Sequence, residues 1–290
     1  MSDFFSPKDV AIAIGVSESS LKRWVDRGLI RAEKTAGGHR RLSLDSVLNY
    51  IRGEGKSLPH PEAIGLPEGI GAQPANEEAA NADFRRAMVA GDELLARRII
   101  LDVFISGMSV AKICDNIITP VFHQIGDLWR CGEIEVFQER RACETCSRVI
   151  HELRRAVGPG PQDGPIAIGG TIDGDPYTLA TGMAELVLRD AGWRAMSLGN
   201  MLPFDALNRA LQSDRPALMW VSVTSVRDMD RFIANFNLLF DEARAVGAAL
   251  VVGGQGLTAD VRQHIRYTTF CDNFRHLEAF ANTIRPRKVE

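Results

Sequence analysis

The stretch SPKDVAIAIGVSESSLKRWVDRGLI, residues 6–30, predicts two short helices joined by a tight turn. Ser6 followed by a proline is typical of a helix start, and Gly15 is typical of a helix end. Ser17 then caps a second helix, which ends at Gly28. Two short helices around a tight turn indicate a helix-turn-helix domain.

Basic and hydroxyl side chains follow on the polar face of the second helix and in the run TAGGHRR, residues 35–41, which predicts a hairpin wing. Such side chains reach base edges and phosphates from a major groove, and a basic wing suits backbone phosphates. We therefore expect a DNA-contact surface here. Its residues are Ser19, Ser20, Lys22, Arg23, His39, Arg40 and Arg41.

Residues 4–52 resemble the MerR family of winged helix-turn-helix regulators. Four segments fall in the family's order: Gly15-Val16-Ser17, Leu21-Lys22-Arg23-Trp24, Gly28-Leu29-Ile30 and Gly37-Gly38-His39-Arg40-Arg41. The resemblance implies that the partner is operator DNA and that binding needs a dimer. No long coiled-coil helix follows the wing, so we expect a homo-oligomer that forms through the later domains.

The charge of the chain is divided unevenly. The 290 residues carry a formal net charge of -3, with the 45% hydrophobic and 24% charged residues of an ordinary globular protein. Residues 1–52 contain 9 Lys and Arg against 6 Asp and Glu, whereas the remainder contains 25 against 31. The basic N-terminal part therefore suits a nucleic-acid partner, which the total charge conceals.

The sequence shows neither a signal peptide nor an apolar run long enough to cross a membrane. Its five cysteines are sparse and odd in number, so we expect a cytoplasmic protein with reduced thiols and no structural disulfide. Cys143 and Cys146 have a spacing that could bind metal, respond to redox state or attach a bilin. A single pair of this kind is more often part of a core, and we expect no metal site.

Composition changes again after the first domain, residues 1–52. The Gly- and Pro-rich residues 53–80 predict a flexible linker. Apolar residues at helical spacing over residues 81–157 then predict an antiparallel four-helix bundle. The expected breaks between its helices are Gly91-Asp92, Gly107-Met108-Ser109 and Cys131-Gly132.

Short apolar runs alternate with amphipathic helices over residues 162–287. The runs at residues 166–169, 195–198, 217–223 and 248–252 predict buried parallel strands. Helices are expected near residues 178–191, 204–213, 229–246, 259–265 and 273–284. This alternation predicts a doubly wound, flavodoxin-like α/β domain with its ligand crevice at the carboxyl ends of the strands. The expected fold is therefore multidomain: a winged helix-turn-helix, a four-helix bundle and an α/β domain.

The bundle and the α/β domain together resemble the cobalamin-binding module of methionine synthase and of light-sensing MerR-type repressors that use adenosylcobalamin. In those repressors a Trp, nine residues and Glu-His cap the corrin, whereas here Trp129 and Glu139 are followed by Arg140. The module's Asp-x-His, which supplies the lower cobalt ligand, corresponds to Asp175-Pro176-Tyr177. Both histidines are replaced. The resemblance assigns ligand contacts to Trp129, Glu139, Arg140, Asp175, Tyr177, Ser222, Thr224, Gly253 and Gly254.

Small residues after the third and fourth predicted strands have two interpretations. Ser222, Thr224, Gly253 and Gly254 occupy positions where the resemblance lets a nucleotide tail pass. Glycines there equally serve tight strand-to-helix turns, with or without a ligand. Both interpretations remain open.

The replaced histidines bear on the identity of the ligand. Neutral imidazole is a good metal ligand, whereas protonated tyrosine and arginine are not. The replacements favour a tetrapyrrole other than cobalamin, such as metal-free biliverdin, whose propionates would suit Arg140 or Arg141. Cobalamin, and a module without any ligand, remain open.

These features favour a DNA-binding transcription regulator whose tetrapyrrole-sensor-like module, with light as one candidate input, controls oligomerisation and operator binding. The alternatives are a ligand-free module that acts through protein contacts and a cobalamin-binding photoreceptor-repressor. We expect no enzyme and no catalytic residues, because the chain has no second substrate domain. A phosphorylated response regulator would need an aspartate where the third strand ends in Ser222-Val223-Thr224.

Overall fold

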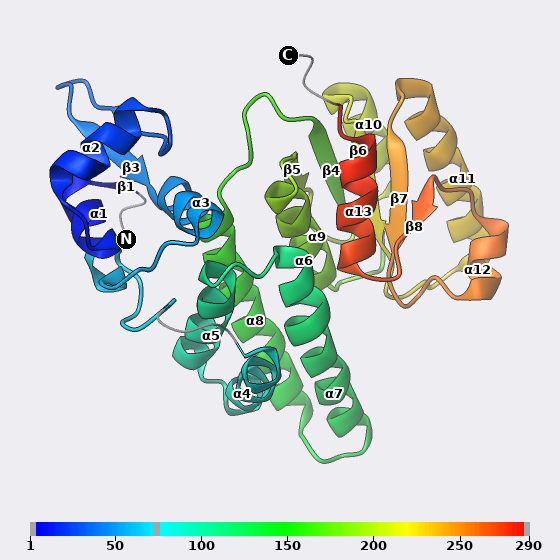
Figure 1. Ribbon diagram of the computed structural model, residues 1–290. Coiled ribbons are helices and arrows are strands. Elements are labelled where there is room, and N and C mark those ends of the chain that lie inside the picture. Colours follow the sequence, from blue (N-terminus) through cyan, green and yellow to red (C-terminus); the bar gives the residue numbers. More distant parts are fainter. Residues whose placement is uncertain (1–3, 72–75, 287–290) are drawn as a thin grey trace. The chain divides into compact units, whose positions relative to one another are not determined.

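The computed structural model describes residues 4–71 and 76–286. The chain forms two compact units, one ending at Gly158 and the other beginning at Pro159 (Figure 1). This boundary coincides with the predicted junction between the bundle and the α/β domain. Within the described ranges, no helix is both long enough and apolar enough to span a membrane.

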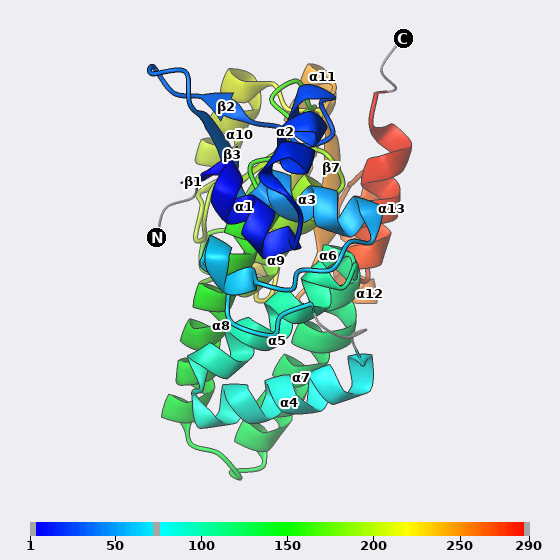
Figure 2. The ribbon, with the colours of Figure 1, turned by 60° about the vertical axis from the view of Figure 1, so that its left-hand side comes forward.

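The N-terminal part of the first unit is a winged helix-turn-helix. Ser6 and Asp9 form the capping box of the first helix, and Gly15 ends that helix with a φ of 73°. Figure 2 shows the loop between β2 and β3 projecting as a wing. The elements are β1 (Phe4–Phe5), α1 (Pro7–Ile14), α2 (Glu18–Asp26), β2 (Glu33–Lys34), β3 (Arg40–Ser43) and α3 (Leu44–Glu54). The two predicted helices are confirmed, and α3 is an addition that the sequence interpretation did not include.

Residues 53–71 differ from the flexible linker predicted for residues 53–80. Leu58, Ile64 and Ile70 are at most 2% exposed, and a short 3-10 helix, η1 (Pro61–Ile64), ends at a left-handed glycine. Apolar side chains at intervals among the glycines and prolines anchor the segment, because their burial is favourable. The following helix also begins at Glu77, earlier than the predicted start of the bundle.

Four helical stretches form the remainder of the first unit, as predicted. Asp92 and Ser109 each cap a helix through the side chain, at the breaks predicted for them. The elements are α4 (Glu77–Ala90), α5 (Glu93–Ile105), α6 (Val110–Ile113), the π-helical turn η2 (Cys114–Ile118), α7 (Thr119–Arg130) and α8 (Val136–Val157). Segments α6, η2 and α7 follow one another without a break and together make the third predicted helix.

Pro120 accounts for the irregular turn in that third helix. A proline has no N–H, so the carbonyl of Asn116, four residues earlier, loses its helical donor. The side chain of Asn81 in α4 donates to this carbonyl instead, at 2.9 Å. The proline is therefore tolerated inside the bundle because a neighbouring helix supplies the missing hydrogen bond.

The second unit is a parallel five-stranded sheet with the order β5-β4-β6-β7-β8. This is the flavodoxin-like order, and it confirms the predicted doubly wound domain. Its strands are β4 (Ile166–Thr171), β5 (Arg194–Ser197), β6 (Leu218–Ser222), β7 (Ala249–Gly253) and β8 (Thr269–Phe270). Its helices are α9 (Leu179–Asp190), α10 (Phe204–Asp214), α11 (Met229–Val246), α12 (Ala259–His264) and α13 (Phe274–Ile284). The two-residue β8 was not predicted.

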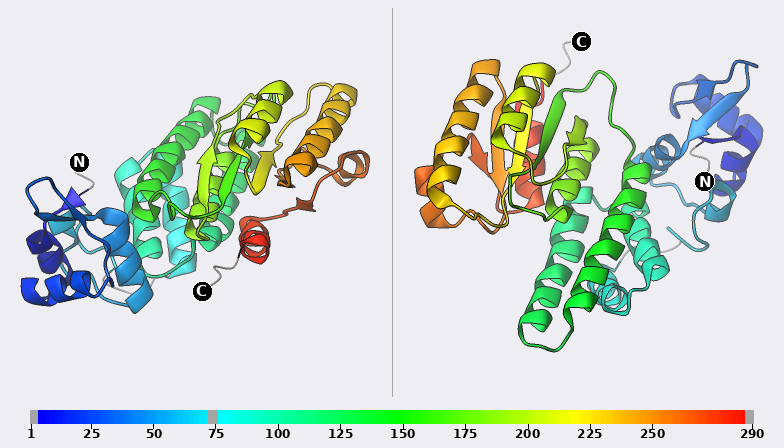
Figure 3. Two further views of the ribbon diagram at one scale, coloured as in Figure 1. Left: turned by 90° about the horizontal axis from the view of Figure 1, so that it is seen from above. Right: turned by 180° about the vertical axis from the view of Figure 1, so that it is seen from behind.

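Helices cover both faces of this sheet. α9 and α13 pack together on the face seen in front in Figure 1, and α10 and α11 pack together on the face seen in front in the right panel of Figure 3. Strand β6 alternates between the two faces. Met219 and Val221 join the apolar core beneath α10 and α11, whereas Trp220 donates a hydrogen bond to Thr181 in α9. Alternate residues of β6 thus face an apolar core on one side of the sheet and a hydrogen-bonded tryptophan on the other.

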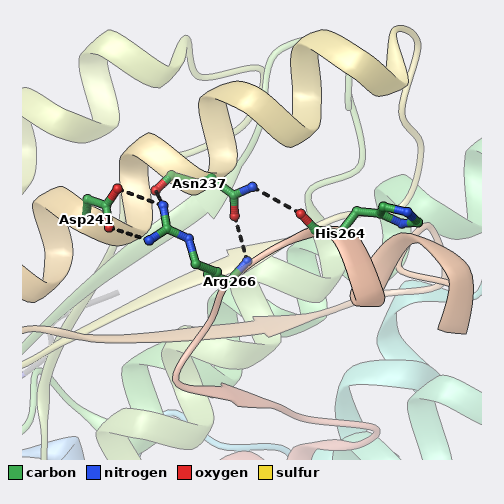
Figure 4. Close-up of polar contacts among 4 residues, drawn as sticks. All are labelled: Asn237, Asp241, His264 and Arg266. Carbon is green, nitrogen blue, oxygen red and sulfur yellow. Dashed lines mark hydrogen bonds and ion pairs between the residues drawn. The ribbon is translucent and has the colours of Figure 1, made fainter.

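An exposed polar cluster attaches the segment before β8 to α11 (Figure 4). The guanidinium of Arg266 donates to both carboxylate oxygens of Asp241, each at 2.7 Å. Asn237 accepts from the Arg266 backbone at 2.8 Å and donates to the His264 carbonyl at 3.0 Å. The hydrogen bonds from Arg266 lower the pKa of the Asp241 carboxyl. We assign this cluster a structural role, because each of its residues is hydrogen-bonded to another residue of the cluster.

Candidate functional site

The second helix of the helix-turn-helix presents the predicted DNA-contact residues at its surface. The hydroxyl of Ser17 caps α2 and lies 2.9 Å from the hydroxyls of both Ser19 and Ser20. Lys22 is exposed and pairs with Glu18 one turn earlier, at 2.8 Å. These side chains are held by weak, exposed contacts, which a phosphate can replace at little cost.

The wing is a short antiparallel ribbon in which Lys34 faces Arg40. Its tip is closed by a hydrogen bond from the Thr35 N–H to the His39 carbonyl, at 2.8 Å. The two arginines differ in their surroundings: Arg40 is half-buried and pairs with Asp26 of α2 at 2.5 Å, whereas Arg41 is exposed. Arg40 therefore fastens the wing to α2, and Arg41 is presented to solvent.

The predicted bundle residues lie on α7 and α8. Trp129 lies in the last turn of α7 with 49% of its surface exposed, which is unusual for so large an apolar side chain. Glu139 lies on α8 with two neighbours from its own helix. Its carboxylate is 3.4 Å from the Arg140 guanidinium and accepts from the Cys143 thiol at 3.3 Å. Trp129 is thus available at the surface, whereas Glu139 already has partners.

The Cys143 and Cys146 thiols behave as core groups. Burial raises the pKa of Cys143 to about 12, and the neighbouring Glu139 carboxylate adds to that effect. Cys146 is fully buried, and its pKa is raised in the same direction by burial. A thiol that stays protonated is a poor nucleophile. In the described part of the chain, no group of three or more His, Cys, Asp or Glu side chains could hold a metal ion.

Asp175 holds together the two loops at the topological switch point of the sheet. Its buried carboxylate accepts from the Thr224 N–H at 2.5 Å and from the Tyr177 N–H at 3.2 Å. Its carbonyl accepts from the Thr171 hydroxyl at 2.7 Å. Asp175 therefore positions the loops after β4 and β6, and Tyr177, at 43% exposed, points outward from them. Ligands of doubly wound sheets bind at this switch point.

The small residues after β6 and β7 pack against the protein itself. A Cβ on Gly254, whose φ is 109°, would collide with the carbonyl of Val223, and one on Gly256 would lie 3.0 Å from the Thr224 carbonyl. Ser222 is only 8% exposed. Gly254 is therefore required by a close turn between two loops, which favours the turn interpretation of these residues over a ligand cradle.

A pocket of about 380 Å³ opens at the carboxyl edge of the sheet, on the side of α10 and α11. Its lining combines acidic and basic side chains, among them Asp173, Asp205, Arg227 and Arg231. None of the predicted ligand residues lines it. The sequence analysis expected a ligand crevice at the carboxyl ends of the strands, but the sequence does not show which face of the sheet the pocket opens on.

Two family models match the chain. A helix-turn-helix domain matches residues 4–55, and a B12 binding domain matches residues 80–154. The chain joins a helix-turn-helix domain to a B12 binding domain. The second match covers the bundle, so the resemblance seen in the sequence is confirmed on independent grounds.

Relatives of two kinds resemble the chain. The HTH-type transcriptional repressor CarA of Myxococcus xanthus is 24% identical over 96% of this chain and 96% of its own length. CarH of the same organism is 24% identical over 83% of this chain and 85% of its own length. The trimethylamine corrinoid protein of Methanosarcina barkeri is 22% identical over 64% of this chain and 87% of its own length. The relatives that span most of the chain are repressors, which agrees with the expectation that it is no enzyme.

A solved structure supports the fold. The monomethylamine corrinoid protein of Methanosarcina barkeri has a TM-score of 0.60, with 14% identity, over 72% of this chain and 100% of that chain. The bundle followed by a parallel α/β sheet is therefore an arrangement found in a corrinoid protein.

The sequence resemblance bears on how a cobalamin would be held. Arg140 and Tyr177 occupy the positions that the sequence resemblance assigns to the two histidines, and neither side chain is an imidazole. The glycine turn at Gly254 is closed by the protein backbone. The chain thus combines a match to a B12 binding domain with the fold of a corrinoid protein.

Proposed function

We propose that this protein is a DNA-binding transcription regulator whose C-terminal module senses a tetrapyrrole. The observation that carries the proposal is a complete winged helix-turn-helix, with exposed basic side chains, in one chain with a B12 binding domain. Similarity to CarA over 96% of the chain supports the same combination. Such a regulator acts in the cytoplasm on operator DNA.

In this proposal, the polar face of α2 enters the major groove and the wing contacts the backbone. Ser19, Ser20 and Arg23 are placed to reach base edges, and Lys22 and Arg41 to reach phosphates. Arg40 acts on DNA through the wing, because its guanidinium is already paired with Asp26. His39, at the closed tip of the wing, is placed for a further backbone contact.

The DNA proposal is tested with fragments selected from a random library by the full-length chain. Arg41→Ala should weaken binding to every selected fragment and reduce the slope of log K against log salt by about one unit, as expected for one lost phosphate contact. Arg86→Ala removes another exposed arginine, from α4, and should leave the slope unchanged. Equal slopes for wild type and Arg41→Ala would exclude a phosphate contact by this residue.

The ligand of the module is proposed to be a tetrapyrrole that needs no protein imidazole. The match to a B12 binding domain supports a ligand of the corrinoid type, whereas biliverdin rests on the replaced histidines alone. Trp129 and Tyr177 are proposed to contact the ligand, since both are large side chains with more than 40% of their surface exposed. Glu139 and Arg140 form a neighbouring polar pair that would meet polar substituents of the ligand.

Absorption spectra test the ligand proposal. The full-length protein is incubated separately with cobinamide, cobalamin, haem and biliverdin, and unbound pigment is removed by gel filtration. A retained pigment whose spectrum changes in Trp129→Ala and in Tyr177→Ala supports the proposed contacts. A colourless protein in all four cases would contradict them and favour a module that acts through protein contacts.

Oligomerisation is the proposed output of the module. Helix-turn-helix proteins bind paired half-sites as dimers. In the described residues α3 is followed by the short η1, and no long helix directly after α3 serves as a separate dimerisation stem. We expect sedimentation of the full-length chain to show an oligomer whose size changes with the bound pigment. A monomer under every condition would contradict this output.

A further inference from the structure

The sheet face beneath α9 carries two rows of side chains at its carboxyl end. Strand register places Thr171, Ser222 and Gly253 side by side in the last row. Gly169 and Trp220 are adjacent in the row before it, roughly 7 Å toward the amino end of the strands. The last row is small, whereas the next row contains the largest of all side chains.

Trp220 fills the space behind the row of small residues. Its side chain is only 3% exposed, and it lies directly over Gly169, where any Cβ would collide with the indole ring. The indole N–H donates to the buried hydroxyl of Thr181 at 2.9 Å. Thr181 in turn lies 3.4 Å from the hydroxyl of Ser197.

This arrangement fixes the indole by both shape and hydrogen bonding. Gly169 supplies the room, and Thr181 satisfies a donor that would otherwise be buried without a partner, which is costly. Any group that entered past Ser222 along this face would therefore meet the ring after a single row. A ribose phosphate carrying a bicyclic base is longer than one row of a sheet.

We propose that Trp220 closes the sheet face to a nucleotide tail, so that the module accepts a tetrapyrrole that has none. The inference rests on the proposed tetrapyrrole ligand and specifies its class: a ring or open chain of four pyrroles without a lower nucleotide. It agrees with Tyr177 in place of the histidine. When no tail is inserted into the module, no protein imidazole is needed to replace the base of that tail on cobalt.

Two corrinoids that differ only in the tail test this inference. The full-length chain is dialysed to equilibrium against cobinamide, which lacks the nucleotide, and against hydroxocobalamin, which carries it. We expect wild type either to prefer cobinamide by about tenfold or more, or to bind cobalamin with its own base still on cobalt. Cobalamin bound as tightly as cobinamide, with the base released in its absorption spectrum, would overturn the proposal.

Variants of Trp220 assign the effect to the indole. Trp220→Gly opens the volume behind Ser222 and should raise the affinity for cobalamin relative to cobinamide by about tenfold or more. Trp220→Phe keeps a ring there without the hydrogen bond, so its preference should stay that of wild type. If Trp220→Gly folds and its affinity for cobalamin relative to cobinamide does not rise, the proposal is overturned. If this variant does not fold, the absorption spectrum of wild type with cobalamin decides between the two outcomes.

The outcomes also separate this inference from the proposed function. Biliverdin has no nucleotide, so its binding should be the same in wild type and Trp220→Phe. If wild type binds no tetrapyrrole but Trp220→Gly binds cobalamin, the proposed ligand is contradicted and the closed face is supported. If wild type binds cobalamin with its base released, the tetrapyrrole ligand of the proposed function stands and the closed face is contradicted.

Discussion

The helix-turn-helix domain and the α/β unit use their polar side chains in opposite ways. In the first, Lys22 and Arg41 are exposed, and the contact that Lys22 makes is a surface ion pair that another charge can replace. In the second, Asp175 and Thr181 are at most 2% exposed and are hydrogen-bonded within the protein. A polar side chain at a position expected to bind a partner can therefore be exposed and available to that partner. It can also be buried and hydrogen-bonded within the protein.

The difference follows from where each set lies. A surface helix keeps its polar face in water, so its residues remain free for recognition whatever the core requires. The carboxyl edge of a doubly wound sheet is different, because loops converge there and their backbone groups need partners. Asp175 meets this need for the loops after β4 and β6.

Removing the Asp175 carboxylate should have the largest effect on stability. Asp175→Ala leaves the part-buried N–H groups of Thr224 and Tyr177 without their acceptor, and we expect a loss of roughly 2–3 kcal/mol. Chemical unfolding followed by tryptophan fluorescence measures the loss, since Trp193 and Trp220 are buried in this unit and report its unfolding.

Asp173 provides the matched control, because it lies in the same loop and is exposed. Asp173→Ala should stay within about 0.5 kcal/mol of wild type. If the two variants were equally stable, the hydrogen bonds of Asp175 between the loops would contribute nothing to stability. Asp175 would then be available as a ligand contact.

Local chemistry made most of the fold predictable. Ser6, Gly15, Asp92 and Ser109 begin or end helices at the positions expected for them, because caps depend only on the next few residues. The four longer strands are apolar runs long enough to be recognised. Strand β8 has only two residues, and it forms because β7 offers an open edge rather than through any pattern of its own.

Features that depend on distant partners were not predictable. The linker expected over residues 53–80 is packed where Leu58 and Ile70 find apolar surroundings, and nothing local announces such a partner. The carboxylate of Asp175 meets a backbone N–H from 49 residues later. The role of Trp220 depends on register, since only pairing of β4 with β6 places Gly169 beneath its ring.

The capping box at the start of α1 should give an intermediate effect. Ser6 accepts from the Asp9 N–H at 3.2 Å, and Asp9 accepts from the Ser6 N–H at 3.2 Å. Ser6→Ala removes one of these acceptors and should destabilise the helix-turn-helix by about 1 kcal/mol. Ser6→Thr retains the hydroxyl and should lose less. Thermal unfolding monitored by circular dichroism measures both, and equal losses would show that the cap hydroxyl is not the cause.

The exposed pair of Asp241 and Arg266 should give the smallest effect, and one that depends on pH. The hydrogen bonds from Arg266 lower the pKa of the Asp241 carboxyl in the folded protein. The stabilisation is therefore present above the carboxyl's ordinary pKa and is lost as the pH falls through the lowered value. Asp241→Asn should unfold slightly more readily than wild type at neutral pH, and the difference should vanish in acid and shrink with salt. A difference that persisted in acid would mean that the Asp241 side chain stabilises this segment through contacts that do not need its negative charge.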